Sequence, residues 1–378
     1  MQIANITIPL ALAILFAGNA SAQQVVKIGT GSPLSGPSAH LGKENENAAR
    51  MAIDQLNAKG FMLGGKKVKL QLLSEDDGGD PKQGTAVAQK LVDAHVNGVV
   101  GHSTSSTTVP ASKIYNDAGI PQISPAATAP AYTRQRFPGA FRLVASDVKQ
   151  GSTLAKYAID NLKARHIAVI DDRSTYGQGL ADEFVKGVKG AGVNIVGREF
   201  TNPNATDYTA LLTSIKAKKP DLVFFGGLDS VGGPMLKQMK ALGINAMFMG
   251  GDGICNESLP RLAGDALGEG KVVCAEAGGV TGPQEQAMLE FRTRYKQQFG
   301  IDIQMYAPYV YDAVMVMATA MQKANSAEPA SYLPELKKIR YEGVSGTIQF
   351  EPNGDLKDAA VTLYTYKGGK KLKITVVR

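Results

Sequence analysis

Apolar and polar residues follow a repeating order in the first third of the chain. Short runs rich in β-branched residues predict strands at 25–31, 67–74, 97–102 and 120–124. After the first of these, residues 44–59 place their alanine, methionine and leucine side chains on one face of a helix. Asp80 followed by Pro81 is typical of a helix N-terminus, with the proline at the first helical position. The pattern therefore predicts alternating strands and helices.

The same order begins again after residues 141–146. Strands are predicted at 166–172, 193–200, 221–227 and 247–252, and helices at 150–162, 178–190, 207–218 and 234–242. The end of the chain differs, with expected helices at 284–299, 308–323 and 332–341 and then β segments with turns at Asn353-Gly354 and Gly368-Gly369. Alternating strands and helices form parallel sheets covered on both faces. Because the order restarts instead of running through eight even repeats, we expect an α/β protein with two doubly wound, Rossmann-like lobes rather than a barrel.

The composition agrees with a folded protein of about two domains. The chain has 378 residues, of which 44% are hydrophobic and 20% charged, which excludes a disordered polymer. The formal net charge is +7, but the lysines are scattered and no basic–aromatic module accompanies them. We therefore interpret the charge as a solubility charge and expect no nucleic-acid partner.

The first 22 residues have the features of a signal peptide. Residues 3–18 are apolar and uncharged, and Ala20-Ser21-Ala22 fits the small-x-small site at which such peptides are cleaved. The segment before the apolar run carries no lysine or arginine, which departs from the usual pattern. A transmembrane anchor is the alternative, but the apolar run is shorter than the roughly 20 residues that span a bilayer. We expect cleavage after Ala22 and an exported protein.

Cys255 and Cys274 are the only two cysteines, 19 positions apart. An even pair in an exported protein predicts one disulfide, which would close a loop within one lobe. No histidine or aspartate lies near them at metal-binding spacing, so no metal site is expected.

Motifs for catalysis are lacking in the sequence. The four histidines form no metal-binding or haem-attachment spacing, and there is no G-x-S-x-G motif. Residues 60–67 contain part of a phosphate-binding loop, but Lys67 stands where serine or threonine is needed. Gly29-Thr30-Gly31 lacks the third glycine and acidic partner of a dinucleotide site. These features favour a binding protein without a cofactor over an enzyme.

Polar residues follow three of the predicted strands, at the sheet edge where open α/β proteins bind ligands. Residues 102–108 are rich in serine and threonine and begin a helix, whose free N–H groups attract a carboxylate. Residues 125–128 offer backbone groups and the hydroxyl of Thr128. Asp252 follows the strand at 247–251 and is an anion available to an ammonium group. For each residue alone, simple helix capping is the competing interpretation.

These stretches resemble the periplasmic leucine/isoleucine/valine-binding proteins, the type I solute-binding components of ABC transporters. Over nearly the whole mature chain, the family's order and spacing are matched by SPLSGPSAHLG, DDGGDPKQGTAVAQKLV, VVGHSTSSTTVPASKIY, ISPAATAPAYT, STYGQGLA, PDLVFFGG and FMGGDG. The resemblance implies two Rossmann-like lobes joined by three crossovers, which close on a ligand. It places the N-terminal lobe at 23–145 and 278–347 and the C-terminal lobe at 146–277 and 348–378.

The resemblance also implies which residues hold an amino acid. Ser105, Ala126, Ala127 and Thr128 would form the corner that meets the carboxylate and ammonium groups. Asp252 would pair with the ammonium group, and Tyr176 would face the ligand from the second lobe. The remaining side-chain contacts are expected from Leu41, Leu228 and Tyr306.

Two departures affect the expected ligand. Leu41 stands where relatives have a large aromatic residue, and Leu228 where some have tyrosine, which favours an apolar or roomier side-chain pocket. Asp252 favours an α-amino acid, although other family members take amides or aromatic carboxylates. The expected function is amino-acid capture by a monomer that serves an ABC permease in the periplasm. A sensory binding protein of the same fold is the alternative that the sequence leaves open.

Overall fold

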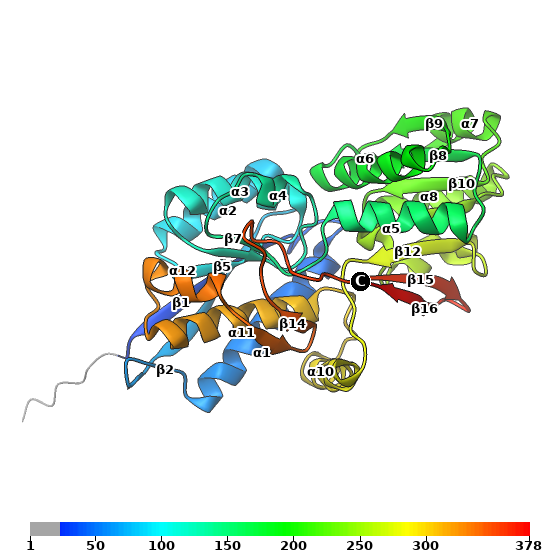
Figure 1. Ribbon diagram of the computed structural model, residues 1–378. Coiled ribbons are helices and arrows are strands. Elements are labelled where there is room, and N and C mark those ends of the chain that lie inside the picture. Colours follow the sequence, from blue (N-terminus) through cyan, green and yellow to red (C-terminus); the bar gives the residue numbers. More distant parts are fainter. Residues whose placement is uncertain (1–22) are drawn as a thin grey trace, which may run out of the picture.

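A computed structural model describes residues 23–378, which form two lobes (Figure 1). The expected signal peptide lies outside the described residues. The first sheet is parallel, with strand order β4-β1-β5-β6-β7. Its strands are β1 (Val25–Ser32), β4 (Lys69–Asp76), β5 (Gly98–Val100), β6 (Gln122–Ser124) and β7 (Ala140–Arg142). The apolar runs predicted as strands in this part of the chain are thus confirmed.

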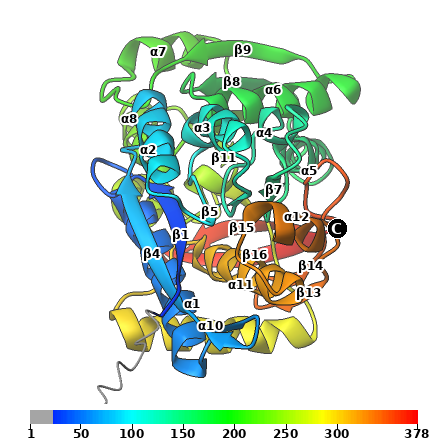
Figure 2. The ribbon, with the colours of Figure 1, turned by 90° about the vertical axis from the view of Figure 1, so that its left-hand side faces the viewer.

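Helices cover both faces of the first sheet. They are α1 (Ala39–Lys59), α2 (Pro81–Asp93), α3 (Ser105–Asp117), α4 (Ala131–Arg134), α10 (Pro283–Phe299), α11 (Ala307–Ala324) and α12 (Pro329–Lys337). Val99 of β5 packs with apolar residues of α2 and α3, whereas the next residue, Val100, packs with those of α1 and α11. Successive side chains of a strand point to opposite faces, so these helix pairs lie on opposite sides of β5, as Figure 2 shows.

The second sheet has the order β16-β15-β12-β11-β10-β8-β9. Its parallel strands are β8 (Ile167–Asp171), β9 (Ile195–Phe200), β10 (Leu222–Gly226), β11 (Met247–Gly250) and β12 (Val272–Glu276), and the antiparallel hairpin β15 (Val361–Lys367) and β16 (Lys370–Val377) extends it. The helices are α5 (Asp147–Asp160), α6 (Thr175–Gly190), α7 (Thr209–Ala217), α8 (Asp229–Ala241) and α9 (Leu259–Ala263), with short 3₁₀ turns η1 (Asp252–Ile254) and η2 (Gly264–Leu267). The expected α/β fold with two doubly wound lobes is confirmed.

The chain passes between the two sheets three times. It leaves the first sheet between β7 and α5, returns between β12 and α10, and crosses again between the hairpin of β13 (Tyr341–Gly343) and β14 (Gly346–Ile348) and strand β15. A second small hairpin, β2 (Met62–Leu63) and β3 (Lys66–Lys67), stays with the first lobe. The crossing segments lie side by side, since Ala145 N donates to Ala277 O at 2.9 Å and Arg142 N donates to Gly354 O at 2.9 Å.

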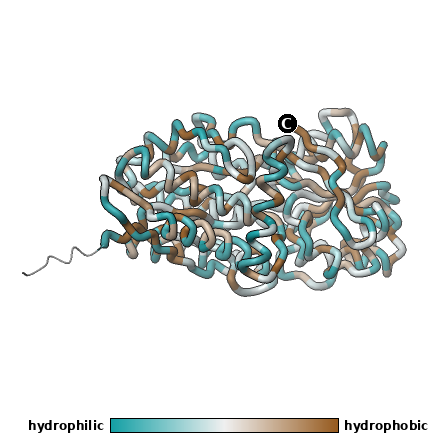
Figure 3. Tube along the Cα trace, turned by 90° about the horizontal axis from the view of Figure 1, so that it is seen from below, coloured by the Kyte–Doolittle hydropathy of each residue, from teal (hydrophilic) through white to brown (hydrophobic). Residues whose placement is uncertain are grey.

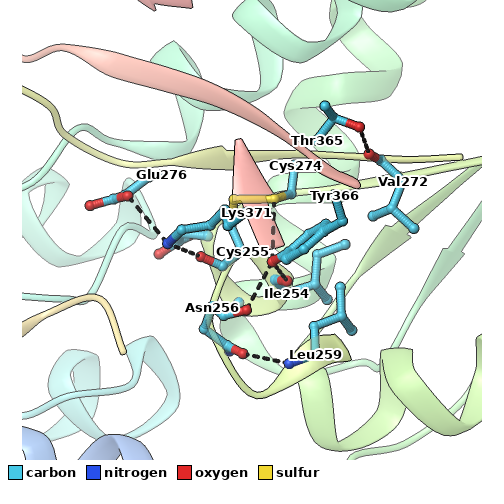
Figure 4. Close-up of a disulfide and its surroundings, with 12 residues drawn as sticks. Ile254, Cys255, Asn256, Leu259, Val272, Cys274, Glu276, Thr365, Tyr366 and Lys371 are labelled. Carbon is cyan, nitrogen blue, oxygen red and sulfur yellow. Dashed lines mark hydrogen bonds and ion pairs between the residues drawn. A yellow bond between two sulfur atoms is a disulfide. The ribbon is translucent and has the colours of Figure 1, made fainter. Parts of the chain in front are cut away.

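The predicted disulfide is present. Cys255 and Cys274 are bonded, with their Cα atoms 5.3 Å apart, and both are buried. The bond joins the segment after η1 to the middle of β12 (Figure 4). The hydroxyl of Tyr366 donates to Asn256 O at 2.9 Å and Lys371 Nζ donates to Cys255 O at 3.1 Å, so β15 and β16 also hold this segment.

Several predicted boundaries were wrong, and several strands had no prediction. The helix expected at 332–341 ends at Lys337, and Tyr341 already belongs to β13. Strand β12 lies in a short apolar run between glycine-rich turns and had no prediction. Hydrophobic and hydrophilic stretches alternate along the trace of both lobes (Figure 3). In residues 23–378, no helix is both long and apolar enough to cross a membrane.

Candidate ligand-binding cleft

A cavity of about 440 Å³ lies between the two lobes. Its wall is built from segments that follow β1, β4, β5 and β6 in the first lobe and β8, β9, β10 and β11 in the second. These are the carboxyl ends of parallel strands, where backbone groups and helix N-termini are free to meet a ligand. The two sheets therefore direct their binding edges at one shared space.

Seven of the nine residues predicted to bind the ligand line this cavity. They are Leu41, Ser105, Ala126, Tyr176, Leu228, Asp252 and Tyr306. Ala127 and Thr128 directly follow Ala126 and are buried, but they do not belong to the cavity wall. The structure thus brings seven predicted residues together from seven separate stretches of the chain, and the individual roles of all nine stay predictions.

The first-lobe wall is fixed by hydrogen bonds beneath it. Ser105 is the first residue of α3, and its hydroxyl accepts a hydrogen bond from Ala129 N at 3.2 Å. The hydroxyl of Ser124 accepts from Ala127 N at 3.1 Å and donates to His102 O at 3.1 Å. These bonds join the segments after β5 and β6. The N–H groups of the first turn of α3 have no partner within the helix and suit an anion.

The second-lobe wall carries a buried carboxylate. Asp252 opens η1 and is 1% exposed. Its Oδ1 accepts from Gln150 Nε2 at 2.9 Å, and its Oδ2 accepts from the hydroxyl of Tyr306 at 2.7 Å. Burial raises the pKa of the Asp252 carboxyl, while these hydrogen bonds oppose the increase. Tyr176 closes the same corner, because its hydroxyl accepts from Gly253 N at 2.8 Å.

The lobes also touch each other around the cavity. Tyr306 precedes α11, so its bond to Asp252 joins the first lobe to the second. Its segment is held by Glu44 of α1, whose carboxylate accepts from the backbone N–H groups of Gln304, Met305 and Ala307 at 2.9–3.0 Å. Glu44 thus fixes the position of Tyr306, although the two residues are about 260 positions apart in the sequence.

Two more contacts bridge the cleft. His40 Nε2 lies 3.0 Å from Asp229 Oδ2, which joins the first turns of α1 and α8. Thr175 N of α6 donates to the hydroxyl of Ser106 of α3 at 3.2 Å. The structure therefore has its lobes in contact on several sides of the cavity.

The rest of the wall divides into an apolar and a polar part. Leu41, Leu228 and Val231 supply aliphatic surface. Asp172 lies elsewhere on the wall, where its Oδ1 accepts from Ser174 N at 3.0 Å and from the Ser174 hydroxyl at 2.6 Å. Burial raises the pKa of Asp172 to about 6. This carboxyl fixes the turn that begins α6, on which Tyr176 is placed.

Sequence reasoning missed the residues that support Asp252 and bridge the lobes. Gln150, Asp147 and Asp229 had no predicted role, and His40 was noted only for the absence of a catalytic spacing. A signal was available for the first two, since Asp147 and Gln150 lie three positions apart at the start of α5 and so share one helix face. In residues 23–378, no group of histidine, cysteine or carboxylate side chains is arranged to hold a metal ion.

Comparisons with known proteins agree with this geometry. Residues 25–371 match the model of the family described as periplasmic binding protein. The chain is 35% identical over 352 residues to the leucine-, isoleucine-, valine-, threonine- and alanine-binding protein of Pseudomonas aeruginosa, covering 93% of this chain and 92% of that protein. It is 37% identical over 336 residues to the leucine-specific-binding protein of Salmonella typhimurium, covering 88% of each.

A solved structure shows the same arrangement. The branched-chain amino acid transporter substrate-binding protein of Streptococcus pneumoniae, in complex with isoleucine, superposes with a TM-score of 0.84 at 26% identity. The match covers 94% of this chain and 99% of that one. With the family model matched over nearly all of residues 23–378, this chain belongs to the periplasmic binding protein family.

Proposed function

We propose that this protein is the substrate-binding component of an ABC importer and captures an aliphatic amino acid between its lobes. The observation that carries the proposal is the cavity itself, which has hydroxyl and amide groups on one lobe and the buried carboxylate of Asp252 on the other. The printed names of the relatives and the isoleucine complex of the solved structure support the same ligand class.

The charges of the cavity suit a zwitterion. A ligand carboxylate placed at the start of α3 would accept hydrogen bonds from the Ser105 hydroxyl and from first-turn N–H groups. A ligand ammonium group would then reach Asp252, since both residues line the same cavity. A ligand with a carboxylate but no amine would be repelled by Asp252. Leu41, Leu228 and Val231 would surround an aliphatic side chain.

Binding by closure follows from the position of the cavity. In an open form the ligand would enter and meet the first-lobe wall, and the second lobe would then bring Tyr176 and Asp252 against it. The three crossing segments between the lobes would serve as the hinge, with the N-terminal lobe at 23–145 and 278–347. The ligand stabilises the closed form only by the difference between its affinities for the two forms.

The cellular setting follows from the family. We infer that the chain is exported to the periplasm with cleavage after Ala22 and acts there as a monomer. The closed form would deliver its amino acid to the membrane permease of the importer.

Calorimetry tests the function directly. Protein freed of co-purified ligand by unfolding and refolding would be titrated with a panel of L-amino acids, with benzoate and aliphatic amides as competing classes. We expect binding of leucine, isoleucine or valine and much weaker binding of benzoate. An absence of heat and of thermal stabilisation with every L-amino acid would refute the proposal, and mass spectrometry of the co-purified molecule gives an independent answer.

A further inference from the structure

A second carboxyl group lies behind Asp252 and has no predicted role. Asp147 is in the first turn of α5 and is fully buried. Gln150, one turn further along, donates from Nε2 to Asp252 Oδ1 at 2.9 Å and to Asp147 Oδ1 at 3.4 Å. One amide group therefore serves two buried carboxyl groups. This contact brings the two acids, 105 positions apart, into one cluster beside the cavity.

The surroundings of Asp147 do not compensate a negative charge. Its Oδ2 is buried and has no hydrogen-bond partner among residues 23–378. Burial raises the pKa of Asp147, the charge of Glu183 of α6 raises it further, and hydrogen bonding by the Thr128 hydroxyl opposes the increase only in part. An ionised carboxylate is costly to bury when one of its oxygens has no donor, and a neighbouring like charge increases that cost.

The cation whose charge acts on Asp147 is Arg142, and it is already engaged. Arg142 of β7 donates from Nε to Asp355 at 3.0 Å and from Nη1 to Ala129 O at 2.9 Å. Its charge is therefore paired with Asp355, and it opposes the burial of Asp147 only in part. Burial, and then the charge of Asp252, raise the pKa of Asp147 well above its usual range.

The groups around Asp252 are neutral donors. They are Tyr306 ahead of α11, Tyr176 of α6 and Gln150 of α5. Burial, and then the charge of Asp252, raise the pKa of each tyrosine hydroxyl, so both stay protonated. Asp252 thus faces the cavity with Asp147 behind it, and none of these three neighbours carries a positive charge. The ammonium group of the ligand would supply one.

We propose that Asp147 and Asp252 share one proton before the amino acid binds, and that docking of the ligand ammonium group at Asp252 releases it to solvent. The proposal rests on the amino-acid function proposed above. The proton leaves a carboxyl oxygen of the pair and passes to water or buffer, and the ligand keeps its own protons. Asp147 is then a specificity-determining residue, since only a cationic head group compensates the second charge.

The expected consequence is proton-linked binding. A cation beside the pair favours its doubly ionised form, so affinity for the amino acid rises with pH through the range in which the pair titrates. Each proton released increases the affinity by up to about tenfold per pH unit. A neutral asparagine at position 147 removes the repulsion, and Asp252 alone would then be ionised already before the ligand arrives.

The test measures protons released per L-leucine bound. Calorimetric titrations in buffers of different ionisation enthalpy, from about pH 5 to about pH 8, give this number directly. Burial is outweighed by the hydrogen bond and charge of Asp229, which leave the pKa of His40 raised, so we expect His40 to take up a proton on closure. The reference protein is therefore the His40→Asn variant, which lacks this imidazole. The test variant adds Asp147→Asn to this reference protein. The control variant adds Asp160→Asn instead, which removes an exposed carboxylate at the other end of α5.

We expect proton release in the reference protein and in the Asp160 variant, and a loss of most of it in the Asp147 variant. Leucine binding without proton release in the reference protein would overturn the inference and leave the amino-acid function intact. Equal release with and without Asp147 would also overturn it, because the proton would then come from another group. If Asp147→Asn does not fold, Asp147→Ser removes the same carboxyl with a smaller side chain. A failure of the reference protein to bind any amino acid would instead refute the proposed function.

Discussion

The imidazole of His40 in the first lobe lies 3.0 Å from the carboxylate of Asp229 in the second, measured from Nε2 to Oδ2, and forms an ion pair with it when the ring is protonated. Asp229 is completely buried, whereas the His40 side chain is 22% exposed. Each residue lies in the first turn of a helix that starts at a sheet edge, so the pair can form only when the two edges are close together. It is therefore a contact of the closed arrangement.

The pair predicts that closure depends on pH. Burial lowers the pKa of His40, but the hydrogen bond and charge of Asp229 outweigh this and leave the pKa above its ordinary value. A raised pKa means that the protonated ring stabilises closure at acidic pH and that this contribution is lost as pH rises through the raised pKa. A partly exposed pair contributes up to about 1 kcal/mol, so His40→Asn should weaken leucine binding by up to about fivefold at about pH 6 and little at about pH 8.

The control for this prediction is His95→Asn. His95 is exposed and has a φ of 54°, a conformation that asparagine also adopts readily. This variant should bind leucine as the unmodified protein does at both pH values, measured by calorimetry. If His40→Asn weakened binding equally at both pH values, the charge of the ring would have no part in closure.

A second prediction concerns the amine of the ligand. Asp252→Asn keeps an oxygen for the hydroxyl of Tyr306 but removes the charge that would pair with the ammonium group. Breaking a buried charge pair costs about 2 kcal/mol or more, so the dissociation constant for leucine should rise about 30-fold or more. The deaminated analogue, 4-methylpentanoate, should bind the variant no worse than the unmodified protein, because its carboxylate gains from the loss of Asp252.

Asp265→Asn is the matched control for Asp252→Asn. Asp265 is in the same lobe, and its carboxylate pairs with Lys240 at the surface. Its removal should leave both dissociation constants unchanged. Equal losses of affinity for leucine and for the deaminated analogue would show that Asp252 does not hold the amine.

The sequence placed the strands of the two parallel sheets that it predicted to within about two residues but began three helices of the cleft about one turn late. The helices expected from 44, 178 and 234 begin at Ala39, Thr175 and Asp229. These extra turns contain His40, Leu41, Tyr176 and Asp229. First turns that face a cavity carry no apolar stripe, so hydrophobic periodicity cannot detect them. Pro234 is the first residue of the helix expected at 234–242, but it lies inside α8.

The supporting polar contacts could not be predicted from local patterns. Glu44 was expected at the start of an amphipathic helix, but it is buried because it accepts N–H groups from residues 304–307. Gln150 reaches Asp252 across 102 positions of sequence. Local periodicity describes which face of an element is apolar, whereas burial of a polar group depends on a partner that only the tertiary fold supplies.

A third prediction concerns the disulfide and stability. The bond closes a loop with a sequence separation of 19 and ties the segment after Asp252 to β12. Replacing both Cys255 and Cys274 by alanine should reduce the free energy of unfolding by about 3 kcal/mol, as the closure of a loop of this size implies. Urea unfolding of the variant and of the unmodified protein, each with and without a reducing agent, measures the difference. A reducing agent should lower the free energy of unfolding of the unmodified protein and leave that of the variant unchanged. Equal free energies of unfolding in all four samples would contradict the prediction.

The fourth prediction concerns the size of the ligand side chain. Leu41 and Leu228 line the cavity, so a larger residue at position 41 should fill room that a leucine side chain needs. Leu41→Phe should weaken leucine binding about tenfold more than alanine binding, since a change of one or two methylene groups in an apolar pocket is worth about 1–3 kcal/mol. Competition titrations with leucine, valine and alanine measure how much affinity each amino acid loses.

Leu289→Phe makes the same substitution at a position of α10 that is 58% exposed, and it should change none of the three affinities. A uniform loss for all three amino acids in Leu41→Phe would mean that position 41 affects closure and not the side-chain pocket. A loss that grows with side-chain size is the result expected if the ligand side chain lies against Leu41 of α1. That result would place the amino acid with its aliphatic end toward Leu41 and its charged groups toward Ser105 and Asp252.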